Sequence, residues 1–521
     1  MIVLFHNGIN PLVYENTITK KLYRCKENCI QVALIFIAKS FPKELIIWCH
    51  ESLKEYINYE SLTTIFHHQL ILSSYSISSE YIIPQEIGYV DQNCFVNVNR
   101  QMNYPTWLMS SDIGGGHARI FREVQLPLKD ESSFDEFLCS LAKFSMAKGV
   151  FCYSNPNLLL ENNKNLSKKG FSQKTKYKLL FSFVRKHYKI QWSIFLFLNL
   201  LVYENKICFI SFLQNLFSSE NNLVNPINVQ IFEINSIKNK INKENFKVDV
   251  LIPTLGRKEY LHNVLKDLTK QILLPRKVII VEQNTALDSS SELDFLDHEW
   301  PFKIDHTFTN RLGACNARNI AMSKVTGDWV FFADDDIRFD HNLLLDSFHA
   351  INKYGLDTLL ISCLQKGENI KSNIVHQSSH FGSGTCIVMK KVIENLSFKK
   401  EHEFGYGEDK DFGMQIRNKG FDIIHFPTIQ MHHLKAPSGG FRVPVFHLWK
   451  DEIPQPKPSP TVMAYNFKHL TEYQLKGVKT LLFLNFYKSQ TIKNPYSYFI
   501  NFNKAWSVSQ QWAKKLLSYE D

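Results

Sequence analysis

Three neighbouring carboxylates, Asp334, Asp335 and Asp336, are the side chains of this sequence with the clearest capacity for chemistry. They directly follow residues 329–333, a short apolar run that predicts a buried strand. The carboxyl ends of strands are where open α/β sheets bind ligands. Because adjacent carboxylates repel one another, the pattern favours a bound divalent cation, Mn²⁺ or Mg²⁺, that substrate phosphates also hold. A solvated acidic turn is the alternative interpretation.

Alternation along an extended chain would send Asp334 and Asp336 to one side and Asp335 to the other. A second acidic group, Glu408, Asp409 and Asp411, opens a predicted helix that ends at Gly420. Carboxylates are favoured at a helix N-terminus by the macrodipole, so capping alone could account for Asp409 or Asp411.

A predicted strand, residues 421–427, follows this helix, and residues 431–442 after it are expected to form a loop. The loop carries His432, His433, Lys435 and Arg442, all of which can meet a metal ion or a diphosphate. His433 is favoured over His432 as the residue whose ring turns inward, because neighbouring side chains in an extended segment point in opposite directions.

The elements that must position these groups begin near Val248. Residues 248–256 predict a buried strand and a turn, residues 258–271 have the apolar spacing of a helix, and residues 277–284 predict a second buried strand. This is a β-α-β unit. Strands that are apolar throughout belong to a parallel sheet covered on both faces.

Residues 248–442 resemble a family 2 glycosyltransferase of the GT-A fold. The matching segments occur in the family's order: VLIPTLGR (250–257), the strand VIIVEQN, NRLGACNARNIA (310–321), the D-x-D element in ADDDI, HFGSGTCIVMKK (380–391), and the GED element at 407–409. Each segment is short, and their combination in order carries the resemblance. The family usually ends its second strand in Asp, where this chain has Glu282, so the nucleobase stays open.

The resemblance implies an inverting transfer of a sugar from a nucleotide-diphosphate donor, with a UDP-sugar favoured. It implies that Pro253, Thr254, Arg257 and Glu282 line the nucleobase and ribose pocket. Further donor contacts are expected from Arg318 to the base or diphosphate, from Asp334, from Asp335 to the ribose hydroxyls, and from Gly384 in the glycine motif.

The same resemblance assigns a metal and a base. Asp336, Asp334 and His433 are the expected ligands of Mn²⁺ or Mg²⁺, which would stabilise the departing diphosphate as a Lewis acid. Asp409 is the expected general base, and Glu408 is expected to hold the acceptor. Gly384 shaping a turn and Arg318 forming a structural ion pair are the alternatives for those residues.

Composition excludes a disordered or fibrous protein, since 44% of the 521 residues are hydrophobic and only 21% are charged. The ten cysteines are scattered without zinc-site spacing, which indicates reduced thiols in a cytoplasmic protein. No secretory leader pattern is present at the N-terminus. The apolar run 193–203 is too short to cross a membrane and predicts a buried helix.

The first 160 residues predict a separate α/β domain of unknown role. Strand-like runs occur at 44–50, 69–77 and 148–154, and residues 133–147 have helical spacing. Gly114, Gly115 and Gly116 follow a strand-like run but lack the remainder of a phosphate-binding motif, so a tight turn is expected there.

Nine Lys and Arg residues and no acid lie between Lys164 and Lys189, which accounts for nearly all of the net charge of +10. A solvated connector is the favoured interpretation, and peripheral contact with the inner face of an anionic membrane is the alternative. Nucleic acid is not expected, because no recognised binding motif accompanies the charge.

The aromatic C-terminal tail is expected to pack on the catalytic domain, with contact to lipid as the alternative.

The sequence therefore predicts four segments: an α/β domain (1–160), a basic helical connector (161–245), a GT-A glycosyltransferase domain (246–445) and a helical tail (446–521). The expected function is glycosyl transfer to a hydroxyl of a glycan or lipid-linked acceptor in cell-surface polysaccharide synthesis. The competing hypotheses are a nucleotidyltransferase, which also places acids at strand ends, and a catalytically inactive sugar-binding module.

Overall fold

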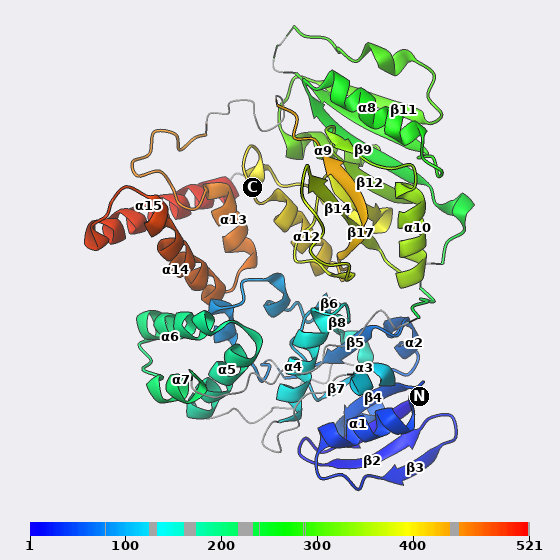
Figure 1. The fold of residues 1–521 in the computed structure, drawn as a ribbon, viewed down its shortest axis with the longest axis vertical. Helices are drawn as coiled ribbons and strands as arrows, with labels where there is room; N and C mark the ends of the chain where they lie inside the picture. Colours follow the sequence, from blue (N-terminus) through cyan, green and yellow to red (C-terminus); the bar gives the residue numbers. More distant parts are fainter. Residues whose placement is uncertain are drawn as a thin grey trace. The chain divides into compact units, whose positions relative to one another are not determined.

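A computed structural model of the chain describes residues 1–78, 80–123, 133–160, 173–216, 233–238, 240–284, 286, 288–437 and 447–518. The chain forms two compact units (Figure 1). Unit 1 comprises Met1–Lys238 and Leu470–Leu481, and unit 2 comprises Asn239–His469 and Leu482–Asp521. These two units are defined by contacts within the chain, and the division into four segments with different roles stays a prediction.

Unit 1 is built on one mixed sheet with the strand order β3-β2-β1-β4-β7-β5-β8-β6. Its strands are β1 (Ile2–His6), β2 (Pro11–Asn16), β3 (Lys21–Arg24), β4 (Leu45–His50), β5 (Ile71–Tyr75), β6 (Tyr104–Pro105), β7 (Ile113–His117) and β8 (Phe151–Ser154). Its helices are α1 (Ile30–Ser40), α2 (Leu62–Ile65), α3 (Ala118–Glu123), α4 (Phe134–Met146), α5 (Gln173–His187), α6 (Ile190–Glu204) and α7 (Phe209–Leu216). The strands expected near 44–50, 69–77 and 148–154 and the helix expected at 133–147 are all present.

The three consecutive glycines form a strand, and the tight turn expected for them is wrong. Gly114, Gly115 and Gly116 lie in β7, between β4 and β5 in the interior of the sheet. A Cβ atom on Gly114 would lie 2.3 Å from Cζ2 of Trp48, and one on Gly115 would lie 2.4 Å from Cδ1 of Ile47. The glycines therefore make room for large side chains of the neighbouring strand, which a sequence pattern alone cannot show.

Replacing Gly114 with alanine should destabilise unit 1 by about 1–3 kcal/mol, because the added methyl group overlaps the buried Trp48 ring and the carbonyl oxygen of Ser73. Gly116→Ala is the matched control, since its closest contact is 3.2 Å, to the end of the Leu72 side chain. Urea unfolding of both variants would measure the difference. Equal stability of Gly114→Ala and the parent protein would contradict the packing role.

The apolar run expected to form a buried helix is buried on one side only. In α6, Phe195, Leu196 and Leu200 are buried, whereas Ile194 and Leu198 are more than 40% exposed. No helix among the described residues is both long and apolar enough to cross a membrane.

Unit 2 is built on a nine-stranded sheet with the order β11-β10-β9-β12-β16-β14-β17-β13, with β15 pairing to β17. Its strands are β9 (Val248–Leu255), β10 (Lys277–Gln283), β11 (Lys303–Thr309), β12 (Trp329–Ala333), β13 (Ile337–Arg338), β14 (Thr358–Gln365), β15 (His376–Gln377), β16 (Thr385–Met389) and β17 (Ile424–His433). Its helices are α8 (Lys258–Thr269), α9 (Ala314–Ser323), α10 (Leu343–Tyr354), α11 (Lys390–Ile393), α12 (Glu408–Asn418), α13 (Pro460–His469) and α15 (Pro495–Ser518). Helix α14 (Glu472–Ser489) contributes residues to both units.

Strands β11, β10, β9 and β12 are mutually parallel, as the apolar strand pattern predicted. The register aligns Thr254 of β9 with Glu282 of β10. Parallel strands end at the same edge of a sheet, so the turns after β9, β10 and β12 converge there. This is how Thr254 and Asp335, 81 positions apart in the sequence, come to share one site.

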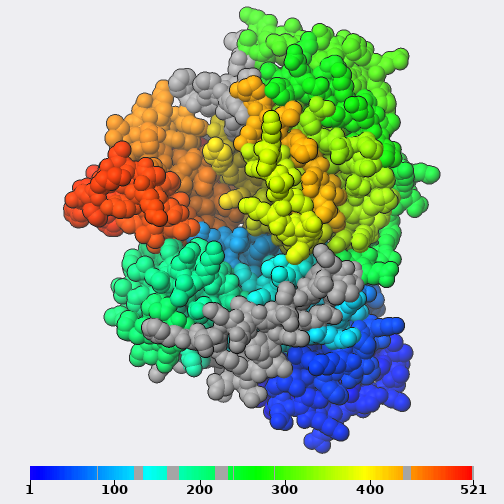
Figure 2. All heavy atoms as spheres, in the orientation of Figure 1, coloured from blue at the N-terminus to red at the C-terminus, as the bar shows by residue number. Residues whose placement is uncertain are grey.

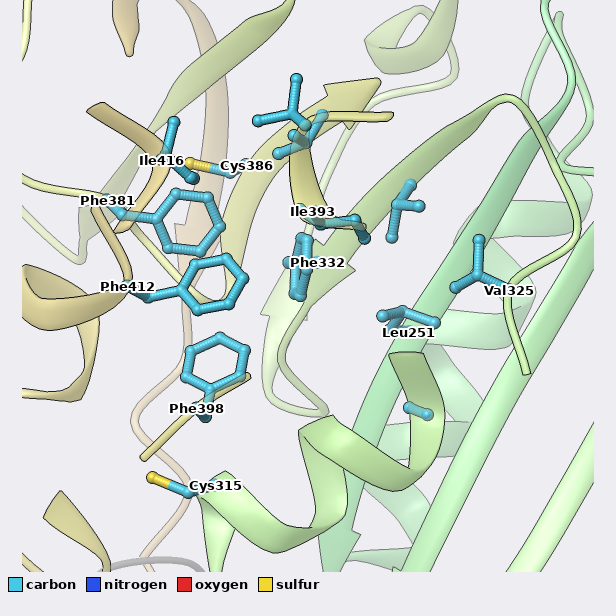
Figure 3. Packing of buried hydrophobic residues seen from close by; sticks show 14 of the residues in the cluster. Leu251, Cys315, Val325, Phe332, Phe381, Cys386, Ile393, Phe398, Phe412 and Ile416 are labelled. Atoms are coloured by element: carbon cyan, nitrogen blue, oxygen red, sulfur yellow. The ribbon is translucent and has the colours of Figure 1, made fainter. Parts of the chain in front are cut away.

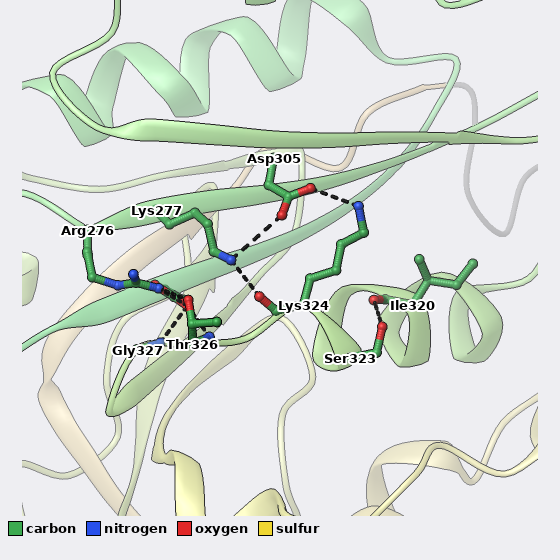
Figure 4. Close-up of polar contacts among 9 residues, drawn as sticks. Arg276, Lys277, Asp305, Ile320, Ser323, Lys324, Thr326 and Gly327 are labelled. Atoms are coloured by element: carbon green, nitrogen blue, oxygen red, sulfur yellow. Dashed lines mark hydrogen bonds and ion pairs between the residues drawn. The ribbon is translucent and has the colours of Figure 1, made fainter.

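A network of ion pairs and hydrogen bonds lies at the other end of these strands, where they begin (Figure 4). Asp249, whose side chain is fully buried, accepts hydrogen bonds from Arg276 and from the backbone N–H groups of Thr326 and Gly327. These contacts join the starts of β9 and β10 to the turn before β12. Lys277 and Lys324 both pair with Asp305 of β11. The network therefore holds four strands in one register.

An aromatic core includes Phe332, from the strand that leads into the acidic segment (Figure 3). Phe332, in the strand before Asp334, contacts Phe381, Phe398 and Phe412, and Phe398 stacks on Phe412 at 4.2 Å between ring centroids. Phe412 belongs to α12, the helix that carries the second acidic group. Packing of these rings ties the acidic end of β12 to the first turn of α12.

Strand β17 continues through His433, so residues 431–433 are a strand and not part of the expected loop. The extra length comes from pairing on both sides. Residues 430–433 pair in parallel with residues 362–365 of β14, and Ile337 and Arg338 of β13 lie opposite His433 and His432. Arg442 lies outside the described residues. In the C-terminal region, α13 packs on α12 and on α15, as expected for a tail that packs on the catalytic domain, but residues 470–481 belong to unit 1.

Candidate active site

A cavity of about 250 Å³ opens where β9 and β10 end. It is lined by Thr254, Leu255, Gly256, Arg257, Lys258, Glu282, Gln283, Asn284, Glu292 and Leu293. Three of the four residues expected in the nucleobase and ribose pocket thus face one cavity. Pro253 is not among the lining residues; it lies within β9, opposite Val281.

Asp335 joins this cavity to the acidic segment. Its carboxylate accepts a 2.8 Å hydrogen bond from Thr254 Oγ1 and a 2.7 Å bond from Arg257 Nη1. Burial raises the pKa of Asp335 to about 6, even though Arg257 and Thr254 act in the opposite direction. Arg257 also lies 3.3 Å from Asp336, so one guanidinium group is shared by two carboxylates.

Asp336 faces the end of β17. Its Oδ1 atom lies 3.2 Å from Nε2 of His433, and its Oδ2 atom accepts a hydrogen bond from the backbone N–H of Ala436. Burial of Asp336 raises its pKa, but the bonds from His433, Ala436 and Arg257 outweigh that effect and the net shift is downward. The hydrogen bond with Asp336 raises the pKa of His433. The structure thus turns His433 inward and leaves His432 exposed, as the sequence predicted.

Asp334 points toward a different group. Its Oδ1 atom lies 3.3 Å from Nη2 of Arg318, and a Cβ atom on Gly384 would lie only 2.1 Å from its Oδ2 atom. Because the chain turns at residues 335 and 336, the contacts do not follow the expected alternation: Asp335 and Asp336 share Arg257, whereas Asp334 contacts Arg318.

Asp409 meets Asp334 at one short loop. The backbone N–H of Ser383 donates to Asp409 Oδ1 at 3.2 Å, while the next residue, Gly384, faces Asp334. Burial raises the pKa of Asp409, with the negative charge of Asp334 adding to the shift and Arg318 opposing it. Burial and the charge of Asp409 raise the pKa of Glu408. Asp334 and Asp409, one from each acidic group of the sequence, therefore belong to one site, whereas Asp411 faces His402 and His469.

Arg318 lies buried between these groups, with 6% of its surface exposed. Its guanidinium group lies 5.6 Å from the centroid of the Phe398 ring, at the edge of the aromatic core. Its Nε and Nη1 atoms have no hydrogen-bond partner among the described residues. Leaving two charged donors unsatisfied in a buried position is costly, so these nitrogens are candidates for binding an anionic group.

Gly384 offers a direct test of this arrangement. A methyl group in Gly384→Ala would force the Asp334 carboxylate to rotate away from Arg318, while the backbone conformation at position 384 is one that alanine can adopt. We expect catalytic activity to fall by ~10-fold or more while the melting temperature changes little. Gly116→Ala, a substitution in unit 1 whose closest new contact is 3.2 Å, is a control for the loss of a glycine. Unchanged activity of Gly384→Ala would contradict the role of Asp334.

Two contacts of the site were missed by the sequence analysis. Glu403 accepts hydrogen bonds from the backbone N–H groups of Cys315 and Asn316, and so caps helix α9, which carries Arg318. A Cβ atom on Gly313 would lie 2.3 Å from the Glu403 carboxyl carbon, which accounts for glycine there. His306 lies 2.9 Å from Glu282, whose other oxygen accepts from the N–H of Glu292. Neither pairing has a local sequence signal.

Comparison with known proteins identifies a family for the part of the chain that carries most of these groups, although His433 lies beyond that part. Residues 249–412 match the family model for glycosyl transferase family 2. Over 168 residues, the chain is 24% and 27% identical to the poly(ribitol-phosphate) beta-N-acetylglucosaminyltransferase TarS of two Staphylococcus aureus strains, Mu50 and MW2. The aligned part is 32% of this chain and 29% of each relative, so the chain spans less than a third of their length.

A solved structure of S. aureus TarS residues 1–349 in complex with UDP-GlcNAc is similar to 48% of this chain and 75% of that one, with 19% identity and a TM-score of 0.35. The GT-A fold expected from the sequence is confirmed by the family match together with the parallel strands and the acidic segment at their carboxyl ends. Residues 249–412 therefore form a glycosyl transferase family 2 domain.

Proposed function

We propose that unit 2 is an inverting glycosyltransferase that moves a sugar from a nucleotide-diphosphate donor to a hydroxyl group of a glycan or a lipid-linked acceptor. One observation carries the proposal: Asp334 and Asp409 meet at the adjacent residues Ser383 and Gly384, with the buried, partly unpartnered Arg318 beside them. A donor-side carboxylate, a candidate base and an anion-binding group are thus collected at one point.

The donor is expected to lie along the carboxyl edge of the sheet. Its nucleoside part fits the cavity between Arg257 and Glu282. Asp335, which was expected to contact the ribose, does not line this cavity; it is 3% exposed and holds Thr254 and Arg257 in place instead. The diphosphate of the donor would then satisfy the unpartnered nitrogens of Arg318. A UDP-sugar is the favoured donor, as the family resemblance implies.

A divalent cation is proposed to bind at the end of β12, where Asp336 and His433 lie 3.2 Å apart. Among the described residues, the ligand atoms of Asp334, Asp336 and His433 do not lie together at metal-binding distance, because Asp334 contacts Arg318. Asp334 would therefore have to turn toward Asp336 to complete the set. Carboxylate oxygens with one imidazole nitrogen suit Mn²⁺ or Mg²⁺. When bound, such a cation would neutralise the negative charge that develops on the departing diphosphate.

Asp409 is the proposed general base. The acceptor oxygen attacks the anomeric carbon on the side opposite the diphosphate and forms the new C–O bond as the bond to the diphosphate breaks. The hydroxyl proton passes to the Asp409 carboxylate, whose raised pKa makes it a better proton acceptor. Glu408, in the same helical turn, is placed to hold the acceptor.

A screen of nucleotide sugars tests the proposal. Purified full-length protein with Mn²⁺ should be stabilised in a thermal-shift assay by a UDP-sugar and should slowly hydrolyse it in the absence of an acceptor. Release of diphosphate from a nucleoside triphosphate and a sugar 1-phosphate would identify a nucleotidyltransferase instead. Binding without any hydrolysis or transfer would support the inactive sugar-binding module.

We also infer that α6 and α7 rest on an anionic membrane surface. Ile190, Ile194, Leu198, Leu201 and Val202 follow helical spacing along α6 and are 39–66% exposed. Ile207, Phe209 and Ile210 extend this apolar surface to α7, which lies with α6 at the surface of unit 1 (Figure 2). Exposed Lys178 and Lys189 lie on α5 and at the start of α6. An apolar stripe flanked by cations is typical of interfacial helices.

The structure changes the design of the membrane test. Lys176 pairs with the buried Glu86, and Lys168 and Lys169 lie outside the described residues, so the basic stretch is a poor target for substitution. The triple variant Ile194→Ser, Leu198→Ser, Val202→Ser should lose co-sedimentation with anionic vesicles, which the parent protein should show and which ~0.5 M salt should weaken. Ile18→Ser with Leu22→Ser, exposed residues near β3, is the matched control. Equal sedimentation of all three proteins would support the solvated connector.

A further inference from the structure

A second cluster of metal-ligating side chains lies between the 3₁₀ turn Lys400–His402 and helix α12. It consists of Glu401, His402 and Asp411, which are 3%, 1% and 2% exposed. One potential ligand atom of each residue lies within 4.8 Å of those of the other two. None of the three belongs to the donor-side group of Asp334, Asp336 and His433, so the proposed reaction does not account for the cluster.

Several polar atoms of this cluster lack partners. Both ring nitrogens of His402 are buried without a hydrogen bond to any described residue, and so is Oε2 of Glu401. His402 Nε2 lies 3.7 Å from Asp411 Oδ1, which is too long for a hydrogen bond. Buried imidazole and carboxylate groups normally find partners, so an unpartnered histidine facing two carboxylates indicates a missing ligand.

The remaining contacts hold the two carboxylates in place without filling the centre of the cluster. Lys468 pairs with the other oxygen of Glu401, and Gln415 donates to Oδ2 of Asp411. His469, at the end of α13, lies 2.7 Å from Asp411 Oδ1. Support of a carboxylate by a neighbouring histidine or amide is the arrangement that orients ligands around protein-bound metals.

We propose that Glu401 Oε2, His402 and Asp411 Oδ1 bind a divalent cation of the zinc class. One imidazole with two carboxylates is a donor set that Zn²⁺ accepts, and a ligand distance of ~2.1 Å requires these atoms to close in by less than 1 Å. The ion would join residues 400–402 to α12, the helix whose first turn carries Glu408 and Asp409. Its role would be structural, and it would bind without a nucleotide.

Metal analysis of the full chain tests the proposal. After loading with ZnSO₄ and gel filtration, the parent protein should retain about one equivalent of zinc, and should prefer Zn²⁺ to Mn²⁺ by at least ~10-fold in competition with a chromogenic chelator. Asp336→Asn, which alters the donor-side group, should retain this zinc. His402→Gln should lose it, whereas His349→Gln, at an exposed position on α10, should not.

Chelation should lower the melting temperature of the parent protein and of Asp336→Asn but not that of His402→Gln. Retention of zinc by a folded His402→Gln variant would overturn the site. If that variant does not fold, the comparison of the parent protein with Asp336→Asn decides the question. Absence of zinc from the parent protein at excess ZnSO₄, or loss of all zinc in Asp336→Asn, would equally overturn the proposal.

Discussion

Replacing Asp409 with asparagine should lower turnover by ~100-fold or more while leaving donor affinity nearly unchanged. The amide keeps the size of the side chain and can still accept the hydrogen bond from the N–H of Ser383. It cannot accept the proton of the acceptor hydroxyl. Initial rates with saturating donor and acceptor, together with calorimetric binding of the donor, would separate the two effects. Lys410→Gln, an exposed neighbour on the same helix, is the matched control and should behave like the parent protein.

The pH profile of Asp409→Asn gives an independent measurement. Burial raises the pKa of Asp409, and the group works only as a carboxylate, so the parent enzyme should gain activity as the pH rises through this pKa. That acidic limb should lie above the ordinary aspartate value of 3.8 and should disappear in the asparagine variant. If donor binding falls together with turnover, Asp409 belongs to the donor site or supports the fold.

The part of the site that follows strand ends could be predicted from the sequence. Asp334, Asp335 and Asp336 directly follow an apolar run that forms a strand. A strand of a parallel sheet ends at the edge where such sheets bind ligands, so the position of these carboxylates could be predicted. The inward turn of His433 also followed from alternation, since β17 continues through that residue. Alternation failed at Asp335 and Asp336 because the chain turns there, so a rule for extended chain no longer applies.

Contacts between distant segments could not be predicted in the same way. Glu403 caps α9 across 87 and 88 positions of sequence, and Ser383 joins Asp409 to the loop beside Asp334. Such pairings depend on how the side chains of the aromatic core pack together. That packing involves many residues at once and cannot be inferred from any single local pattern in the sequence. The glycines of β7 make the same point, because their role depends on the volume of Trp48 and Ile47 in the adjacent strand.

Replacing Asp336 with alanine should abolish transfer, with a loss of ~100-fold or more, and should weaken binding of the nucleotide diphosphate. Of Asp334, Asp335 and Asp336, Asp336 has the most partners, namely Arg257, His433 and the N–H of Ala436. Without this carboxylate, the cationic side chains of Arg257 and His433 remain at the site, and one of the negative charges that could hold a divalent cation is lost. The parent protein should likewise lose activity in excess EDTA and recover it on addition of Mn²⁺ or Mg²⁺.

His432→Ala is the control for this experiment, because His432 is the exposed neighbour of His433 on the same strand. It should keep full activity and full dependence on the metal. Full activity of the parent protein in excess EDTA would contradict the metal assignment. In that case Arg257, His433 and Arg318 would have to neutralise the departing diphosphate by themselves, and Asp336→Ala would strengthen nucleotide binding by removing a repulsive charge. The sign of the change in nucleotide affinity therefore distinguishes a carboxylate that holds a cation from one that merely orients Arg257 and His433.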